Sequence, residues 1–239
     1  RFYAEIAECK SVKYQKDNNL DVNIDEAIAL ANKEKVRIVI FSNPCNPTSR
    51  IVTKDDIRKL INNTDALVVL DEAYMDFAEN ESLLGEFEKY DNLIILKTCS
   101  KALGSAALRL GFAVANKTLT NVIRAVKSPY NVNSVSQALG EVLFSHPDYI
   151  DNCIETVVNS RKELYSAILE IKSDKIEKVY ETHTNFVFMK VKNAKQVFEK
   201  MKENSIIIRN MGDYLRINAG TKYENEKMLE TFKKVLEEV

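Results

Sequence analysis

A lysine and an arginine follow a strongly apolar stretch near the middle of the chain. Leu93–Leu96 leads into Thr98, Ser100 and Lys101, and Arg109 lies eight residues further on. So apolar a run is expected inside a sheet, and the polar cluster at its end would open into the crevice where α/β proteins bind ligands. Desolvation there favours the neutral amine, which forms a Schiff base with a carbonyl. Because hydroxyls and a guanidinium suit a phosphate, the segment predicts a site for a phosphorylated aldehyde.

Two further apolar runs deliver polar groups in the same way. Ala66–Leu70 ends in Asp71, and Val36–Phe41 is followed by two Asn-Pro pairs within Asn43–Thr48. A buried carboxylate needs a cation, so Asp71 suits a protonated heterocyclic nitrogen. The Asn-Pro pairs fix a rigid turn that can aim an amide side chain at a ligand. Three strand ends are therefore expected to converge on one site.

Four sequence segments carry a resemblance to a known family. In chain order they are NPCNPT, LDEAY, TCSKALGSAALRLGF and YLRINAGT. Together they resemble the signature motifs of pyridoxal-phosphate aminotransferases of fold type I, and their wording is closest to the histidinol-phosphate aminotransferase branch. The resemblance runs from Arg1 to Val239. It implies an α/β fold of aspartate-aminotransferase type, with a three-layer α/β/α large domain around a mostly parallel sheet and a smaller C-terminal α/β domain.

The resemblance also implies a role for each polar side chain. Lys101 would bind the cofactor pyridoxal 5'-phosphate covalently, Asp71 would pair with the pyridinium nitrogen, and Tyr74 and Asn46 would hydrogen-bond the ring hydroxyl. Catalysis would fall to Lys101, Asp71 and Tyr74. The cofactor phosphate and the substrate would be held by a larger set, namely Thr98, Ser100 and Arg109 for the phosphate and Arg216, Arg209 and Asn185 for the substrate.

Among the substrate ligands, Arg216 would take the α-carboxylate of an amino acid. Simpler interpretations remain open for the other two, Arg209 and Asn185. Arg209 follows the apolar run Ile206–Ile208 and is either a substrate-phosphate ligand or an ordinary surface arginine. Asn185 resembles a position near the family's substrate carboxylate, although an asparagine before a strand is commonly a turn residue.

The sequence departs from the family pattern in several places. Ser49 stands where the Asn-Pro turn usually continues with glycine, and Ser105 and Ala107 lie in a segment that commonly reads GLAGLR. The family's N-terminal arm, its glycine-containing phosphate loop and its ring-stacking aromatic residue have no counterpart. We therefore expect a chain that is truncated at its N-terminus.

Composition bounds the other classes of function. The chain has 239 residues, 45% of them hydrophobic, and a formal net charge of −1, which gives no electrostatic case for nucleic acid or an anionic membrane. Four cysteines without a CxxC pair indicate neither a metal site nor a redox motif, and no GxGxxG, GxxxxGK or HExxH spacing occurs. Without a signal peptide or a membrane-length apolar run, a cytoplasmic protein is expected. Lys97 and Lys127 are interpreted as solvated charges.

Alternating strand and helix signals must position these groups. We expect strands near Ser11–Tyr14 and at 36–41, 66–70, 93–97 and 111–115, with helices after Asp25 and Lys54. A long helical pattern runs from about Asn133 to Ile171, with a break near 146–148. The second part is expected to hold one strand at 178–191, a helix at 194–203, a strand pair at 205–209 and 214–218, and a closing helix at 224–238. These patterns predict a cofactor-binding large domain over 1–132, and a bridging helix with a small domain over 133–239.

The predicted function is amino-group transfer with pyridoxal phosphate between a small-molecule amino donor and a 2-oxo acid. The resemblance implies histidinol phosphate and 2-oxoglutarate as substrates in histidine biosynthesis, giving imidazole acetol phosphate and glutamate, and it implies a homodimer. One alternative is a decarboxylase of a phosphorylated amino acid such as threonine phosphate, which would use the same lysine. Another is an inactive fragment that folds without cofactor.

Overall fold

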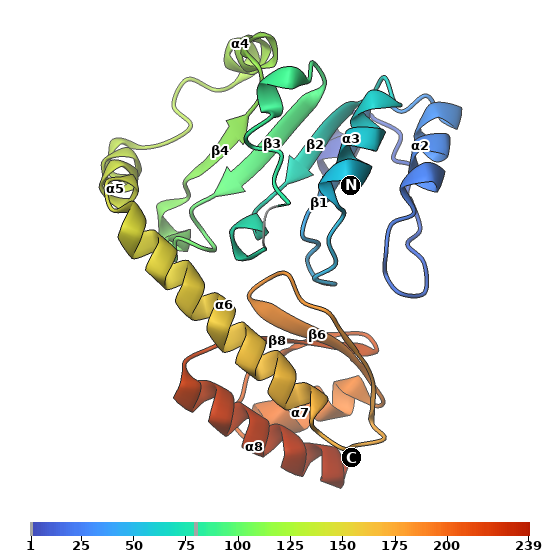
Figure 1. Ribbon diagram of the computed structural model, residues 1–239, viewed down its shortest axis with the longest axis vertical. Helices are drawn as coiled ribbons and strands as arrows, with labels where there is room; N and C mark the ends of the chain where they lie inside the picture. The colour runs from blue at the N-terminus through green and yellow to red at the C-terminus, as the bar shows by residue number, and fades with distance from the viewer. Residues whose placement is uncertain (1, 79–80) are drawn as a thin grey trace.

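The computed structural model describes residues 2–78 and 81–239, and two β-sheets dominate it (Figure 1). The N-terminal sheet has the strand order β1-β2-β3-β4. Its first three strands are parallel and the fourth is antiparallel to the third, which confirms the mostly parallel sheet; the strands are β1 (Ile38–Ser42), β2 (Leu67–Asp71), β3 (Leu93–Thr98) and β4 (Gly111–Val114).

Two helices cover one face of the N-terminal sheet. They are α2 (Ile24–Lys33) and α3 (Lys54–Asn62), and Thr53 caps α3 by accepting a hydrogen bond from the Asp56 N–H. Their apolar stripes meet the inward side chains of the strands in a buried cluster that includes Ile24, Ile57, Leu60, Ile61, Val68, Leu70, Leu93 and Ile95. On the opposite face Ile38 and Ile40 remain 55% and 66% exposed, because no described element packs over them.

Several short elements and three further helices complete the first part and lead to the second. They are α1 (Phe2–Ile6), the 3-10 turns η1 (Met75–Phe77), η2 (Phe87–Lys89) and η3 (Ala106–Leu108), and the helices α4 (Lys117–Val126), α5 (Ser134–Phe144) and α6 (Pro147–Leu169). Pro147 opens α6, where its missing N–H costs no hydrogen bond, so the expected break between α5 and α6 is confirmed. Helix α6 then descends from the first sheet to the second (Figure 1). The predicted boundary at 132/133 falls between α4 and α5 and stays a prediction.

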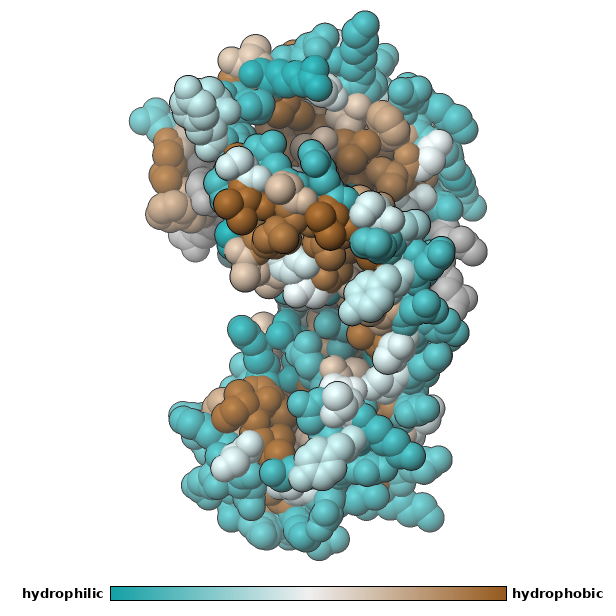
Figure 2. Space-filling model, turned by 90° about the vertical axis from the view of Figure 1, so that its left-hand side faces the viewer, coloured by the Kyte–Doolittle hydropathy of each residue, from teal (hydrophilic) through white to brown (hydrophobic). Residues whose placement is uncertain are grey.

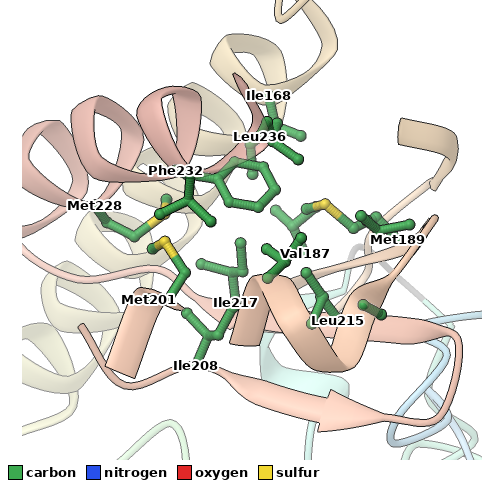
Figure 3. Close-up of a cluster of buried hydrophobic side chains, with 14 of the residues drawn as sticks. Ile168, Val187, Met189, Met201, Ile208, Leu215, Ile217, Met228, Phe232 and Leu236 are labelled. Carbon is green, nitrogen blue, oxygen red and sulfur yellow. The ribbon is translucent and has the colours of Figure 1, made fainter. Parts of the chain in front are cut away.

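The C-terminal sheet is antiparallel, with the order β5-β6-β8-β7. It consists of β5 (Ile176–Tyr180), β6 (Phe186–Val191), β7 (Arg209–Met211) and β8 (Tyr214–Asn218), packed against α7 (Ala194–Glu203) and α8 (Lys222–Glu238). Figure 3 shows the core between them, where Phe232, Met228 and Leu236 of α8 meet side chains of β6, β8 and α7. The apolar stripe of α8 is therefore part of this core, and the closing helix lies where the sequence predicts it.

Three strand predictions were wrong. Ser11–Tyr14 lies outside any strand, because this segment pairs with no neighbouring strand in the described chain. The single strand expected at 178–191 is two antiparallel strands joined by a turn at 181–185. In the third case, β7 begins only at Arg209, so 205–208 lies before the strand rather than in it.

A smaller apolar cluster lies between the two sheets. Tyr74, Phe77 and Ala102 come from the first part and Phe186 from the second, with side chains of α6 packed around them. In the space-filling view a waist separates an upper from a lower lobe, and apolar patches lie on both lobes, the larger ones on the upper (Figure 2). Within residues 2–78 and 81–239, no helix has the length and apolar character to cross a membrane, and no cluster of three or more histidine, cysteine or acidic side chains could hold a metal ion.

Candidate active site

The carboxyl ends of β1, β2 and β3 bring the sequence-predicted residues to one edge of the sheet. The Asn43 N–H donates to the Asp71 carbonyl at 2.9 Å, which joins the loop after β1 to the end of β2. The Glu72 N–H donates to the Leu96 carbonyl at 2.9 Å, which joins the end of β2 to β3. The three strand ends therefore converge as expected.

The Asn-Pro segment forms a closed turn with Asn46 at its exposed tip. The side chain of buried Asn43 accepts from the Val52 N–H at 2.8 Å and donates to the Val52 carbonyl at 3.0 Å. The Cys45 N–H donates to the Arg50 carbonyl at 2.8 Å, and both Asn-Pro peptide bonds are cis. At the tip, Asn46 Oδ1 accepts a hydrogen bond from Arg216 Nη1 at 2.7 Å, so an amide from the first part meets a guanidinium from the second.

Asp71, Tyr74 and Lys101 gather around the turn after β2. Asp71 Oδ1 accepts from the Ala73 N–H at 3.1 Å, and this bond fixes the turn that presents Tyr74. The Lys101 Nζ lies 5.2 Å from the centroid of the buried Tyr74 ring, within the range of a cation–π contact. The same ring meets Phe186 edge-on, with centroids 5.5 Å apart. The structure thus brings together the three residues expected to be catalytic.

The expected phosphate-binding groups form a second cluster after β3. Thr98 Oγ1 donates to Ser100 Oγ at 3.0 Å and accepts from the Ser100 N–H at 3.1 Å. Arg109 adopts a left-handed backbone, with φ 52°, at the end of η3. Its exposed guanidinium donates to the Ala106 carbonyl at 3.0 Å rather than to either hydroxyl. The hydroxyls are therefore in contact, whereas the arginine contacts its own turn.

Arg216 is the most desolvated cation of the site. Its guanidinium carbon lies 4.7 Å above the Phe186 ring, and its Nε is buried without a hydrogen-bond partner among the described residues. Burial, followed by the nearby charge of Arg209, lowers the pKa of Arg216, while Tyr74 opposes the shift. A buried cation of this kind gains most from an anionic ligand.

The other two substrate-ligand candidates flank Arg216. Arg209 is its directly opposite neighbour on β7, and both arginines line a cavity of about 640 Å³ beside the start of α8. Arg209 itself is exposed. The Asn185 carbonyl accepts from the Ala219 N–H at 3.0 Å, and its side-chain Oδ1 is buried without a hydrogen-bond partner among the described residues. Two unsatisfied polar atoms, one on β8 and one in the turn that leads into β6, are what a site for a polar ligand is expected to contain.

The sequence did not predict a cluster of buried charged side chains that lies behind the site. Lys97 Nζ pairs with Asp76 at 2.5 Å, and both side chains are mostly buried, so the interpretation of Lys97 as a solvated charge was wrong. Glu72 is fully buried and accepts from Ser82 Oγ at 2.6 Å, and burial raises the pKa of its carboxyl group. The available signal was strand alternation, which turns Lys97 and Glu72 toward the covered face of the sheet.

Comparison with known proteins identifies the family. The family model described as aminotransferase class I and II matches residues 3–232. The chain belongs to this aminotransferase family. It is 39% identical over 239 residues to a histidinol-phosphate aminotransferase of Clostridium kluyveri, covering 98% of this chain and 67% of that relative. It is 40% identical over 236 residues to one of Clostridium novyi, covering 97% and 65%. This aminotransferase chain thus spans about two thirds of these relatives' length.

Solved structures confirm the fold of the aminotransferase. The histidinol-phosphate aminotransferase from Clostridium acetobutylicum superposes with a TM-score of 0.89 at 22% identity, covering 100% of this chain and 75% of that one. The Sinorhizobium meliloti enzyme, solved in complex with pyridoxal-5'-phosphate, gives 0.89 at 19% identity, covering 99% and 67%. An L-threonine-O-3-phosphate decarboxylase from Porphyromonas gingivalis gives 0.82 at 23% identity, covering 98% and 72%. These likenesses establish fold type I, whereas the reaction has to be inferred from the residues of the site.

Proposed function

We propose that this chain carries the active site of a pyridoxal-phosphate-dependent aminotransferase. The observation that carries the proposal is a continuous set of contacts across the two parts of the chain. Asn46 contacts Arg216, Arg216 lies over Phe186, Phe186 packs on Tyr74, and Tyr74 lies beside Lys101. This chain of contacts places an amine and a partly desolvated guanidinium at the same junction between the two parts, as an enzyme acting on an amino acid or its analogue requires.

The residues present fit pyridoxal phosphate. When bound, this cofactor withdraws electrons from the carbon that bears the substrate's amino group. Lys101 supplies the amine that attaches the cofactor's aldehyde, and Asp71 keeps a proton on the ring nitrogen. Tyr74 and Asn46 bind the ring hydroxyl. The phosphate falls to the cluster after β3, made of Thr98, Ser100 and Arg109.

Lys101 has a second task in this proposal, which is to move a proton. Once the substrate's amino group has displaced Lys101 from the cofactor's aldehyde, the free Nζ would take the proton from the substrate's Cα and would deliver it to the cofactor carbon that had carried the aldehyde. The buried Tyr74 ring at 5.2 Å limits the positions that the amine adopts. A flexible four-carbon side chain needs such a wall to hold its amine at a defined place.

The substrate class that the site favours is an amino compound with an anionic group. Arg216 and Arg209 are adjacent cations, one buried and one exposed, and they suit a carboxylate and a phosphate. Together with the names of the relatives, this pair supports histidinol phosphate and 2-oxoglutarate as substrates, within histidine biosynthesis. A homodimer in the cytoplasm belongs to the same proposal. A decarboxylase of a phosphorylated amino acid would use the same residues and differ in which Cα bond lies across the ring plane.

Covalent labelling tests the proposal directly. Incubation with pyridoxal phosphate followed by borohydride reduction is expected to label Lys101, which peptide mapping reports. Lys97 is the built-in control, because it lies four residues away and is held in an ion pair. Lys101→Arg should abolish the label and the cofactor's visible absorbance. Label on several lysines, or none, would contradict the assignment and favour a chain that folds without cofactor.

A further inference from the structure

Ser49 combines complete burial with a backbone conformation that favours glycine. Its φ is 59°, in the left-handed region, and its N–H donates to the Cys45 carbonyl at 2.7 Å to close the Asn-Pro turn. The residue is 0% exposed. A side chain there adds strain that glycine would avoid, so the contacts of its hydroxyl must offset that strain.

The Ser49 hydroxyl joins the two parts of the chain. Its Oγ lies 3.0 Å from Thr182 Oγ1 and 2.8 Å from Thr184 Oγ1, and it accepts from the His183 N–H at 2.8 Å. Thr182 Oγ1 in turn donates to the Phe186 carbonyl at 2.5 Å. If Ser49 donates to Thr182 and accepts from Thr184 and His183, its single proton and both lone pairs are used. The hydroxyl is then fully satisfied inside a buried contact.

This contact fixes the segment that leads into β6. Residues 182–184 are held from the first part by Ser49, and the carbonyl of Thr182 also accepts a hydrogen bond from Arg161 of α6. Two residues after Thr184, the Phe186 ring lies between Tyr74 and Arg216. The Ser49 contact therefore sets where Phe186 begins its strand, and Phe186 sets the plane on which the Arg216 guanidinium rests.

We propose that Ser49 is a positioning residue, whose hydroxyl fastens the start of β6 to the Asn-Pro turn and thereby places the Arg216 guanidinium against Asn46. The proposal deepens the proposed function, on which it rests for the role of Arg216 as a substrate ligand. Ser49 contacts neither Arg216 nor Lys101; it acts through Thr182, Thr184 and Phe186.

The test follows the Arg216 guanidinium itself and needs no turnover. In the 239-residue chain with 15N-labelled arginine, the Nε–H signal of Arg216 is assigned by its loss in Arg216→Lys. Because this Nε is buried, the signal should be sharp and slow to exchange with solvent. Ser49→Gly, which suits the left-handed backbone and should fold, is expected to broaden the signal and speed its exchange about tenfold. Ser49→Ala should do the same, since it also lacks the hydroxyl.

Ser205→Gly is the matched control. Ser205 is also a serine with a left-handed backbone, at φ 61°, but it is exposed and lies at the end of α7. This variant should leave the Arg216 signal unchanged. An unaltered Arg216 signal in Ser49→Gly or Ser49→Ala, or an equal change in Ser205→Gly, would overturn the positioning role. Failure of the proposed function would appear separately, as missing label on Lys101 in the unmutated chain.

Discussion

Asp71 and Glu72 are neighbours in sequence, yet their surroundings assign them different tasks. Asp71 is half-buried at the ligand-facing strand edge, with one oxygen held by the Ala73 N–H. Glu72 is fully buried on the opposite side, beside Ser82 and near the Lys97–Asp76 pair. Only Asp71 lies on the side of the proposed site, because successive side chains at a strand end point in opposite directions.

Asp71→Asn should leave the cofactor bound and reduce turnover by several orders of magnitude. An amide cannot hold a proton on the ring nitrogen, so the cofactor would withdraw electrons less strongly. Turnover and the visible absorbance of the cofactor, measured on the same sample, check this prediction. Asp65→Asn is the control, because Asp65 is exposed and lies two residues before the same strand begins. Near-normal turnover in Asp71→Asn would show that the Asp71 carboxylate only stabilises the turn after β2.

Arg209→Ala should weaken phosphorylated substrates selectively. Arg209 is exposed, so solvent screens its charge, and we expect an increase in KM of about tenfold for the phosphorylated substrate. Unphosphorylated amino donors should be unaffected, since they lack the group that Arg209 would contact. Arg124→Ala, an exposed arginine on α4, controls for the loss of one surface charge. An equal effect on both substrate types would assign Arg209 a structural role.

Secondary-structure elements were predictable where apolar periodicity and caps agreed, and not where the chain turns without glycine or proline. The strands β1, β2 and β3 and the helices α3, α7 and α8 lie within a few residues of their predicted positions. The turn at 181–185 reads ETHTN, whose threonines favour strands, so two strands were merged into one. Ser11–Tyr14 has the alternation of a strand but lacks a partner, which sequence alone does not reveal.

The sequence predicted which residues lie together at the sheet edge, whereas it did not predict their contacts, and the roles of these residues stay predictions. Motif order identified Lys101, Asp71 and Tyr74, which the structure brings together at the expected sheet edge. The hydrogen bond from Arg216 to Asn46 joins residues 170 positions apart. Such a contact depends on how the two sheets pack, which local propensity does not encode.

Glu72, directly after β2, also makes the folding stability of the chain depend on pH. Burial raises the pKa of its carboxyl above the unfolded value, so the folded state binds the proton more tightly. The contribution of the protonated Glu72 carboxyl to folding stability is therefore full below the unfolded pKa of about 4.3 and is lost as the pH rises through the folded pKa. Glu72→Gln should remove this dependence and raise stability at neutral pH relative to the unmutated chain.

Denaturant unfolding of both chains from pH 4 to pH 8 measures the effect. The difference in unfolding free energy should grow with pH in favour of Glu72→Gln, because only the unmutated chain must bury the negative charge of the Glu72 carboxylate. Asp76 and Lys97 are the charged groups beside Glu72, and both remain in the variant. A difference that does not vary with pH would show that Glu72 keeps the same charge on folding.

The two sheets are coupled through a small apolar cluster around Phe186. This ring is 0% exposed and contacts Tyr74 of the first part, whereas each sheet has its own larger core. The Ser49 contact and the bond from Arg216 to Asn46 add polar links across the same junction. The candidate site lies at this junction, so its geometry depends on how tightly the two parts are held together.

Phe186→Ala should loosen this coupling, at a cost of about 3–5 kcal/mol for loss of a fully buried ring. The chain contains no tryptophan, so Phe87→Trp and Phe198→Trp, introduced one at a time, report on the first and second cores. With Phe186 intact, the two reporters should give overlapping unfolding transitions in denaturant. In the Phe186→Ala background the midpoints should separate, because the less stable part no longer gains stability from docking.

Phe232→Ala provides the contrast, since Phe232 is equally buried but belongs to the second core alone. It should lower the midpoint seen by the Phe198→Trp reporter directly. Its effect on the first core should be confined to what is transmitted through Phe186. In the double variant Phe186→Ala with Phe232→Ala, the Phe87→Trp midpoint should therefore match that of Phe186→Ala alone. A further fall of that midpoint in the double variant would mean that the polar links through Ser49 and Arg216, and not the Phe186 cluster alone, carry stability from one part to the other.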